Sequence, residues 1–198
     1  MIKRLFDVIF SFFGLILVSP LLLLLAILIK LDSPGPIFYR GKRVGKDGKE
    51  FRIFKFRSMV ENAEELGGSS TAADDPRLTR IGKFLKKYQL DELPQLINVL
   101  KGEMSLVGPR PEVKMYVDMM TDEERKTILS IKPGMTDLAS LWDFHEGEIL
   151  RGSPDPEKTY QEKIRPTKIK LQLEYVKNRS FLLDLKIILK TVLKVFYG

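Results

Sequence analysis

The chain contains no cysteine and only one histidine among its 198 residues. The lack of cysteine excludes disulfide bonds, zinc–thiolate sites and a thiolate nucleophile. His145 is the lone imidazole and stands among acidic residues, so we interpret it as a structural or surface residue. Any catalytic site in this chain must therefore be built mainly from carboxylates, amines and guanidinium groups.

Basic residues outnumber acidic ones, with 33 Lys and Arg against 26 Asp and Glu, and the formal net charge is +7. Such an excess indicates an anionic partner, and nucleic acid, acidic lipid headgroups and phosphorylated substrates all carry suitable charge. We expect no nucleic acid partner, because basic and acidic residues are interleaved and no nucleic-acid-binding module is recognisable.

Residues 5–29 form an almost uninterrupted apolar run that contains only Asp7, Ser11 and Ser19 as polar residues. At a rise of ~1.5 Å per residue, a helix of this length can span a bilayer. The run is longer than the hydrophobic region of a signal peptide, and no small-residue cleavage site follows it. The ordinary prediction is therefore one membrane anchor.

Pro20 lies near the middle of the apolar run, where it removes one backbone hydrogen bond and favours a bend. Ser19 can bond the carbonyl that such a bend frees. Lys3 and Arg4 precede the run and Lys30 follows it. The positive-inside rule places both flanks on the cytoplasmic side, which a single crossing cannot satisfy. On these residues alone, a re-entrant helix and a spanning helix are equally well supported.

The residues after the apolar run predict an α+β fold that is mostly α. Asp32-Ser33-Pro34-Gly35-Pro36 ends the apolar helix, and an Asp-Gly turn between residues 37–45 and 50–57 predicts one small β-hairpin. Helical patterns, one with a Thr121–Glu124 capping box, follow. These helices are expected at residues 60–66, 74–87, 92–101, 112–118, 121–131, 154–178 and 180–196.

The helix expected at 180–196 carries an apolar stripe on one face and lysines on the other. This pattern is typical of an amphipathic helix that lies on a membrane surface. It is equally typical of a helix that packs on a domain core. The pattern alone leaves both alternatives open.

Two adjacent carboxylates, Asp91 and Glu92, lie between a basic run and an apolar helical pattern. Asp91 is a favourable N-cap, and Pro94 fits the first turn of a helix. Capping alone would account for Asp91. The same position at a helix N-terminus also favours an anion, either the carboxylate itself or a bound phosphate.

Four basic residues are candidates for binding substrate phosphate: Lys55, Arg57, Lys86 and Arg110. Arg110 stands between two prolines, so a stiff loop holds its guanidinium, either for a phosphate or simply to pair an acid. Carboxylates, fixed cations and Mg²⁺ are the usual apparatus of phosphoryl transfer, and an aspartate can itself be the nucleophile. Together with a membrane helix, they suggest transfer of a phosphorylated group to a lipid.

Six segments, in order along nearly the whole chain, resemble the bacterial sugar transferase family, the monotopic polyprenyl-phosphate phosphoglycosyl transferases. In size the chain is similar to the small, single-domain members. The segments are Phe6-Asp7-Val8 with Ser19-Pro20, Pro34-Gly35-Pro36-Ile37-Phe38, Phe54-Lys55-Phe56-Arg57-Ser58-Met59, Leu90-Asp91-Glu92-Leu93-Pro94-Gln95-Leu96, Asn98-Val99-Leu100-Lys101-Gly102-Glu103-Met104-Ser105 and Gly108-Pro109-Arg110-Pro111.

The resemblance implies a ping-pong reaction through a covalent intermediate. Asp91 would attack the β-phosphorus of a UDP-sugar, release UMP and carry the phosphosugar until polyprenyl phosphate, undecaprenyl phosphate in bacteria, accepts it. The resemblance also implies Mg²⁺ near Asp91 and a positioning or proton-handling role for Glu92. Lys55 and Arg110 would contact the diphosphate. The product would enter glycoconjugate assembly as its first membrane-bound intermediate.

The resemblance further implies a membrane helix broken at Ser19 and Pro20. Residues 1–33 would then form a re-entrant helix, and residues 34–198 a catalytic domain resting on the cytoplasmic face of the bacterial inner membrane. Inner-membrane lipid would thus be a partner of the chain. This implication favours the re-entrant helix over the spanning one.

Two positions depart from the family pattern. Lys86 stands where the family usually has an arginine, which keeps the charge but removes a bidentate contact. After Pro133-Gly134 the family has Ile-Thr-Gly-Leu-x-Gln, whereas this chain has Asp137 and Ser140 at the glycine and glutamine positions; we expect this difference to bear on the sugar used. The alternative function is a non-catalytic, membrane-anchored scaffold that binds anionic lipid or an acidic partner.

Overall fold

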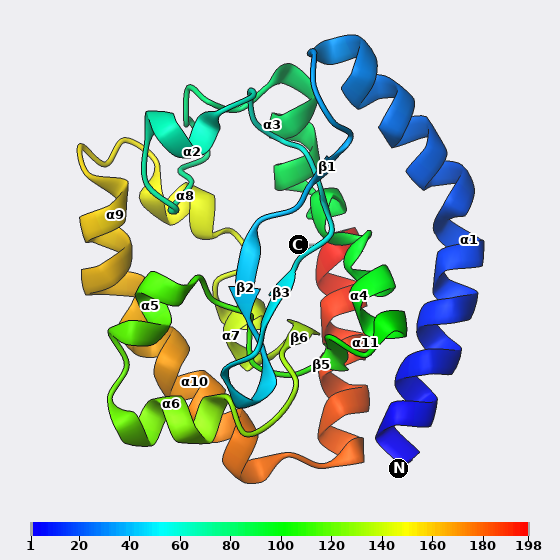
Figure 1. Ribbon diagram of the computed structural model, residues 1–198, viewed down its shortest axis with the longest axis vertical. Helices are drawn as coiled ribbons and strands as arrows, with labels where there is room; N and C mark the ends of the chain where they lie inside the picture. Colours follow the sequence, from blue (N-terminus) through cyan, green and yellow to red (C-terminus); the bar gives the residue numbers. More distant parts are fainter. Residues whose placement is uncertain (1, 198) are drawn as a thin grey trace.

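The computed structural model describes residues 2–197, which form helices and short strands around several small cores (Figure 1). This α+β, mostly α architecture confirms the predicted fold class. The helices are α1 (Ile2–Asp32), α2 (Ala63–Leu66), α3 (Arg80–Lys87), α4 (Gln95–Lys101), α5 (Lys114–Asp118), α6 (Asp122–Ile128), α7 (Leu138–Trp142), α8 (Glu146–Leu150), α9 (Pro156–Thr159), α10 (Arg165–Asn178) and α11 (Phe181–Tyr197). The strands are β1 (Phe38–Tyr39), β2 (Lys42–Val44), β3 (Glu50–Arg52), β4 (Lys55–Phe56), β5 (Ser105–Val107) and β6 (Gly134–Thr136).

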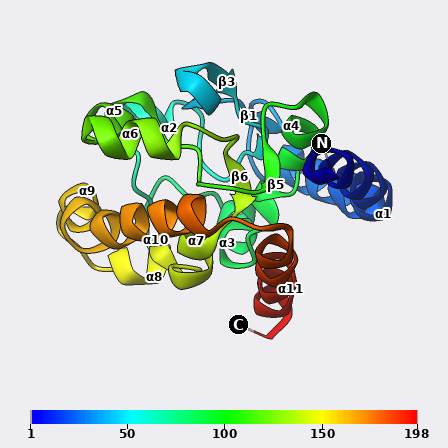
Figure 2. The ribbon, with the colours of Figure 1, turned by 90° about the horizontal axis from the view of Figure 1, so that it is seen from below.

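Helix α1 curves along one edge of the molecule, on the opposite side from α9 (Figures 1 and 2). It stays helical through Pro20, so the break predicted at Ser19 and Pro20 is absent and a continuous curved helix takes its place. The Ser19 hydroxyl donates to the Ile16 carbonyl at 2.8 Å. That carbonyl is the one Pro20 cannot pair, so the serine satisfies the group that the proline frees.

Both ends of α1 contact the rest of the molecule. Near its start, the buried Asp7 carboxylate accepts hydrogen bonds from the Ser105 hydroxyl at 2.8 Å and the Leu106 backbone N–H at 3.0 Å. Near its end, Leu25 and Ile29 are buried in an apolar cluster with side chains of α3 and β4. The helix is therefore anchored at two separated points on the same body.

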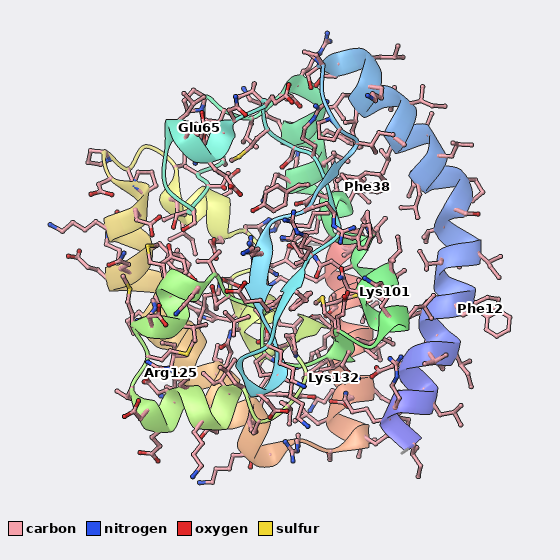
Figure 3. The ribbon with its side chains drawn as sticks, in the orientation of Figure 1. Phe12, Phe38, Glu65, Lys101, Arg125 and Lys132 are labelled. Atoms are coloured by element: carbon pink, nitrogen blue, oxygen red, sulfur yellow. The ribbon has the colours of Figure 1, made fainter. Side chains whose placement is uncertain are left out.

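The outer face of α1 is apolar and exposed. Phe12 points away from the other elements (Figure 3), and Leu17 is 81% exposed. By length and composition, α1 is the one helix in residues 2–197 that could cross a membrane. Exposed apolar surface on this scale is typical of contact with lipid or a partner.

The predicted hairpin is present and is built in two pieces. Strands β2 and β3 pair antiparallel around a turn at 46–48, in which Asp47 adopts a φ of 58°. Strands β1 and β4 then continue the antiparallel pairing, with Phe38 opposite Phe56. Strand β4 carries Lys55, one of the predicted site residues.

A second, parallel strand pair joins β5 to β6, with Ser105 opposite Gly134 and Val107 opposite Thr136. This pair was not predicted, because each strand is only three residues long and their partners are distant in the sequence. The two backbones approach closely where the pair ends, and a Cβ at Gly134 would collide with backbone atoms of Gly108.

Several helix boundaries differ from the predicted ones. Helix α3 begins at Arg80, later than expected, because Thr79 caps it by accepting from the Gly82 N–H at 2.9 Å. The capping box of Thr121 and Glu124 at the start of α6 is confirmed. The helix expected at 154–178 is α9 followed by a π-helical turn and α10.

Helix α11 has features of both predicted alternatives, packing on the core and an apolar surface that a membrane could cover. Ile187 is buried in a core cluster with Tyr175 and Val107. Leu182 and Leu189 on α11 are 77% and 60% exposed. One side of α11 therefore packs on the core, while apolar side chains elsewhere on it remain open to a membrane surface.

Candidate active site

A cleft of about 540 Å³ brings together five of the predicted site residues: Lys55, Lys86, Asp91, Glu92 and Arg110. They come from β4, the end of α3, the turn before α4 and the loop after β5. The segment 69–74, the residues around α7 and α8, and residues of other elements, among them Lys83, Gln95 and Lys168, also line the cleft. Residues far apart in the sequence thus share one concave surface, as in most small-molecule sites.

Asp91 lies in a single 3₁₀ turn, Leu90–Glu92, rather than at a helix N-cap. Helix α4 begins only at Gln95, with Pro94 at the N-cap position, so the predicted capping role of Asp91 is wrong. The turn follows Gln89, whose φ of 57° is left-handed and whose amide donates to the Phe144 carbonyl at 2.8 Å. This bond ties the turn to the segment between α7 and α8.

Glu92 is held between two cations. Lys55 Nζ lies 2.7 Å and Arg110 Nη2 lies 2.5 Å from Glu92 Oε1, and Arg110 Nη1 lies 3.3 Å from Oε2. Burial alone would raise the pKa of Glu92, but the Arg110 and Lys55 charges hold it well below its ordinary value. The Glu92 carboxylate in turn raises the pKa of Arg110. Glu92 is therefore a fixed anion that orients both cations toward the cleft.

Asp91 is more deeply buried than Glu92 and far less engaged. It is 2% exposed, and its nearest cation is Lys86, with Nζ 3.6 Å from Oδ2. Within residues 2–197, no donor has the distance and angle of a hydrogen bond to the Asp91 carboxylate. The two neighbouring carboxylates thus differ in kind, one paired on both oxygens and one with its lone pairs free to react or bind.

Arg57 does not belong to the cleft. Its buried guanidinium donates to the backbone carbonyl and hydroxyl of Ser33, at 2.7 and 3.0 Å, and to the Pro34 carbonyl. It therefore satisfies carbonyl groups at the end of α1. The prediction that Arg57 binds substrate phosphate is wrong, because Arg57 lies beyond the end of β4 at Phe56 and these carbonyls already occupy its guanidinium.

The wall of the cleft beyond Arg110 carries an ionic group that sequence reasoning missed. Lys168, 4% exposed on α10, lies 2.9 Å from Asp143 Oδ2 and 2.6 Å from Glu146 Oε2. Burial raises the pKa of Asp143 to about 6, although the Lys168 charge opposes that shift. Burial would lower the pKa of Lys168, but Glu146 and Asp143 keep it well above its ordinary value. No local motif links these residues, so only the fold reveals the group.

The residues that depart from the family pattern have distinct places. Asp137 is buried and caps α7, since its Oδ1 accepts from the Ser140 backbone N–H at 2.7 Å. Burial raises the pKa of Asp137. Ser140, one turn along α7, lines the cleft. Ser140 therefore forms part of the cleft surface, whereas Asp137 stabilises the helix α7 that carries Ser140.

A divalent cation would have few protein ligands here. Residues 2–197 hold no group of three Asp, Glu, His or Cys side chains able to bind a metal. Mg²⁺, however, is commonly bound through one or two carboxylates, water and substrate phosphates. The Asp91 carboxylate, which accepts no hydrogen bond and lies in a cleft lined by Lys55, Lys86 and Arg110, fits that kind of site, whereas Glu92 is already paired.

Comparison with known proteins gives one consistent result. A family model described as bacterial sugar transferase matches residues 1–198. The chain is 39% identical over its full length to a UDP-N-acetylgalactosamine-undecaprenyl-phosphate N-acetylgalactosaminephosphotransferase of Aeromonas hydrophila and covers 44% of it. It is 36% identical over 99% of its length to a UDP-glucose:undecaprenyl-phosphate glucose-1-phosphate transferase of Escherichia coli and covers 40% of it. With the exopolysaccharide production protein PSS of Rhizobium leguminosarum bv. phaseoli it shares 38% identity over 96% of this chain and 93% of that protein.

Proposed function

The chain belongs to the bacterial sugar transferase family, and on that basis we propose that it transfers a phosphosugar from a UDP-sugar to undecaprenyl phosphate and releases UMP. The names of two relatives, which act on UDP-N-acetylgalactosamine or UDP-glucose and on undecaprenyl phosphate, support the substrate classes. The chain spans less than half the length of those two relatives. A name that refers to exopolysaccharide production supports a role at the start of glycan assembly.

The contrast between Asp91 and Glu92 carries the proposed mechanism. Glu92 has both oxygens paired to Arg110 and one also to Lys55, so it is a poor nucleophile. Asp91 is more deeply buried and accepts no hydrogen bond within the described residues, so its lone pairs are available. Asp91 is therefore the nucleophile, and Glu92 positions the cations.

The reaction proceeds in two displacements. An Asp91 carboxylate oxygen bonds to the β-phosphorus, the bond from that phosphorus to the bridging oxygen breaks, and UMP leaves with that oxygen. A phosphate oxygen of undecaprenyl phosphate then attacks the same phosphorus and breaks the bond to Asp91, which returns as a carboxylate. The acceptor leaves as undecaprenyl diphosphosugar, and neither step requires a net proton transfer.

Lys55 and Arg110 stabilise the charge on the diphosphate during both displacements. Their shared partner Glu92 fixes their position before substrate arrives, so little reorganisation is needed at the moment of reaction. Lys86, close to Asp91, is suited to a phosphate oxygen as a point charge. Mg²⁺ held by Asp91 and the diphosphate would supply further neutralisation of the phosphate charge.

A monotopic position on the cytoplasmic face of the inner membrane completes the proposal. Both ends of α1 are docked on the catalytic body, which supports a helix that enters and leaves by the same face. The chain has no cysteine, so single cysteines at Ile2 and Lys49 report topology without background. In sealed vesicles, an impermeant thiol reagent should label both from the same side. Labelling from opposite sides would contradict the re-entrant topology.

The activity is tested by UMP release from a panel of UDP-sugars with undecaprenyl phosphate and Mg²⁺. Asp91→Asn should lose at least about a thousandfold in kcat, whereas Asp118→Asn, at an exposed i,i+4 pair with Lys114, should keep it. Full turnover by Asp91→Asn would refute the nucleophile. If the wild-type chain bound anionic vesicles but released no UMP from any donor, the scaffold alternative would replace the proposed function.

A further inference from the structure

The buried amide of Gln95 lines the cleft without a partner. Gln95 is 1% exposed, and its Nε2 makes no hydrogen bond within the described part of the chain. An unpaired amide donor in a buried position is costly, so such groups usually have a partner in the functional complex. Gln95 begins α4, one turn after Asp91, and therefore adjoins the site of attack.

The ionic group of Asp143, Glu146 and Lys168 forms another wall of the cleft and provides hydrogen-bond acceptors, whereas Gln95 Nε2 is a donor. Asp143 and Glu146 share a single cation, Lys168, so the group carries a net charge of about −1 at neutral pH. A negative wall repels phosphate, which is attracted instead to Lys55, Arg110 and Lys86. It suits a neutral group with hydroxyls, because carboxylate oxygens accept hydrogen bonds from them.

The geometry of the displacement indicates which part of the UDP-sugar lies next to Asp91 and Glu92. In a transfer to Asp91, the attacking carboxylate and the departing UMP lie roughly in line through the β-phosphorus. The glycosyl oxygen then projects to the side, directly from the phosphorus under attack, whereas the ribose lies one phosphate further away. The residues that adjoin the dyad are therefore the ones within reach of the sugar.

We propose that Gln95 and the Asp143–Glu146–Lys168 wall form the subsite for the donor's glycosyl group, and that this group is an uncharged sugar. This inference rests on the proposed function. Gln95 Nε2 donates to a sugar oxygen, and the carboxylates of the wall accept from sugar hydroxyls. A sugar with a carboxylate of its own is disfavoured by repulsion from the wall.

The experiment compares two buried glutamines. Gln172 is also 1% exposed with an unpartnered amide, but it is not among the residues that line the cleft. Gln95→Met and Gln172→Met both keep side-chain length and lose no hydrogen bond from these amide nitrogens, so both should keep the melting temperature. The KM for the UDP-sugar should rise roughly three- to tenfold in Gln95→Met only, as expected for one lost hydrogen bond.

Inhibition by UDP, which lacks the sugar, separates the glycosyl subsite from a nucleotide subsite. The inhibition constant of UDP should stay within about twofold of wild type in Gln95→Met. An unchanged KM, or equal shifts in the KM and the UDP constant, would overturn the assignment. If wild type releases no UMP from any donor, the proposed function fails, and calorimetric affinities for UDP-sugar and UDP are compared across the same variants.

A second experiment tests the charge of the sugar. Wild type should turn over a UDP-hexuronic acid with a kcat/KM at least about tenfold below that of the matching neutral UDP-hexose. Glu146→Gln should narrow this ratio, because it removes one negative charge from the wall. Equal use of both donors by wild type would refute the uncharged-sugar assignment while leaving UMP release, and so the proposed function, intact.

Discussion

Replacement of Lys55 by arginine should remove the alkaline limb from the pH profile of kcat/KM for the UDP-sugar. Burial lowers the pKa of Lys55 to about 8, although the Glu92 carboxylate opposes that shift. Lys55 is therefore charged below pH 8 and neutral above it. Because the proposed contact of Lys55 with the diphosphate needs the charged form, kcat/KM should fall as the pH rises through about 8.

The magnitude follows from the fraction of charged Lys55. With a pKa of about 8, roughly nine-tenths of the side chain is charged at pH 7 and about one-tenth at pH 9. Wild-type kcat/KM should thus fall about tenfold between these two pH values. Arginine stays charged across the range, so Lys55→Arg should keep a flat profile even if its absolute rate is lower.

The assay is initial-rate UMP release at subsaturating UDP-sugar between pH 6.5 and 9.5. In a ping-pong reaction, kcat/KM for the donor reports the free enzyme and the first displacement, so titration of the acceptor phosphate does not enter. Lys83→Arg is the matched control, because Lys83 also lines the cleft but is exposed. This control should retain the alkaline limb.

Either of two results would refute the reasoning. A wild-type profile that stays flat to pH 9.5 would show that Lys55 does not lose its proton in this range or does not bind phosphate. An alkaline limb that persists in Lys55→Arg would assign the titration to another group in the cleft.

Three further predictions test the scaffold around the cleft. Asp7→Asn should lower the free energy of unfolding by about 1–3 kcal/mol in thermal or denaturant unfolding, because the amide nitrogen that replaces one carboxylate oxygen cannot accept the hydrogen bond that Ser105 or Leu106 donates. Arg57→Lys should lower the melting temperature but leave the KM for UDP-sugar within about twofold, since Arg57 binds carbonyls at the end of α1. A large rise in KM would indicate that Arg57 binds the substrate after all. Gly134→Ala should destabilise by at least about 2 kcal/mol, as its Cβ would meet the Gly108 backbone, and an unchanged melting temperature would contradict the close β5–β6 packing.

The sequence predicts those elements that local chemistry determines. The Asp-Gly turn predicts the hairpin, Thr121 and Glu124 predict the start of α6, and Ser19 is correctly expected to satisfy a carbonyl freed by Pro20. In each case, residues within a few positions of one another make the decisive contact. Lys55, Lys86 and Arg110 also reach the cleft, as their charge and rigid context indicate.

The remaining features depend on contacts between distant segments. Asp91 fits an N-cap pattern, yet the turn is fixed by Gln89 and its bond to Phe144, far along the chain. Arg57 carries the same charge as Lys55, and only the packing of α1 decides that it binds carbonyls instead of substrate. The Asp143–Glu146–Lys168 wall likewise forms only in the folded chain, because Lys168 on α10 pairs with Glu146 on α8.

The central claim is that Asp91 forms a covalent bond to the phosphosugar, and mass spectrometry of the intact chain tests it most directly. With a UDP-sugar substrate and Mg²⁺ but no undecaprenyl phosphate, the wild-type chain should release up to one UMP per active site. It should gain the mass of one phosphosugar on the peptide that contains Asp91. Addition of undecaprenyl phosphate should remove that mass. UMP release that requires the acceptor, or an adduct that survives in Asp91→Asn, would contradict the claim.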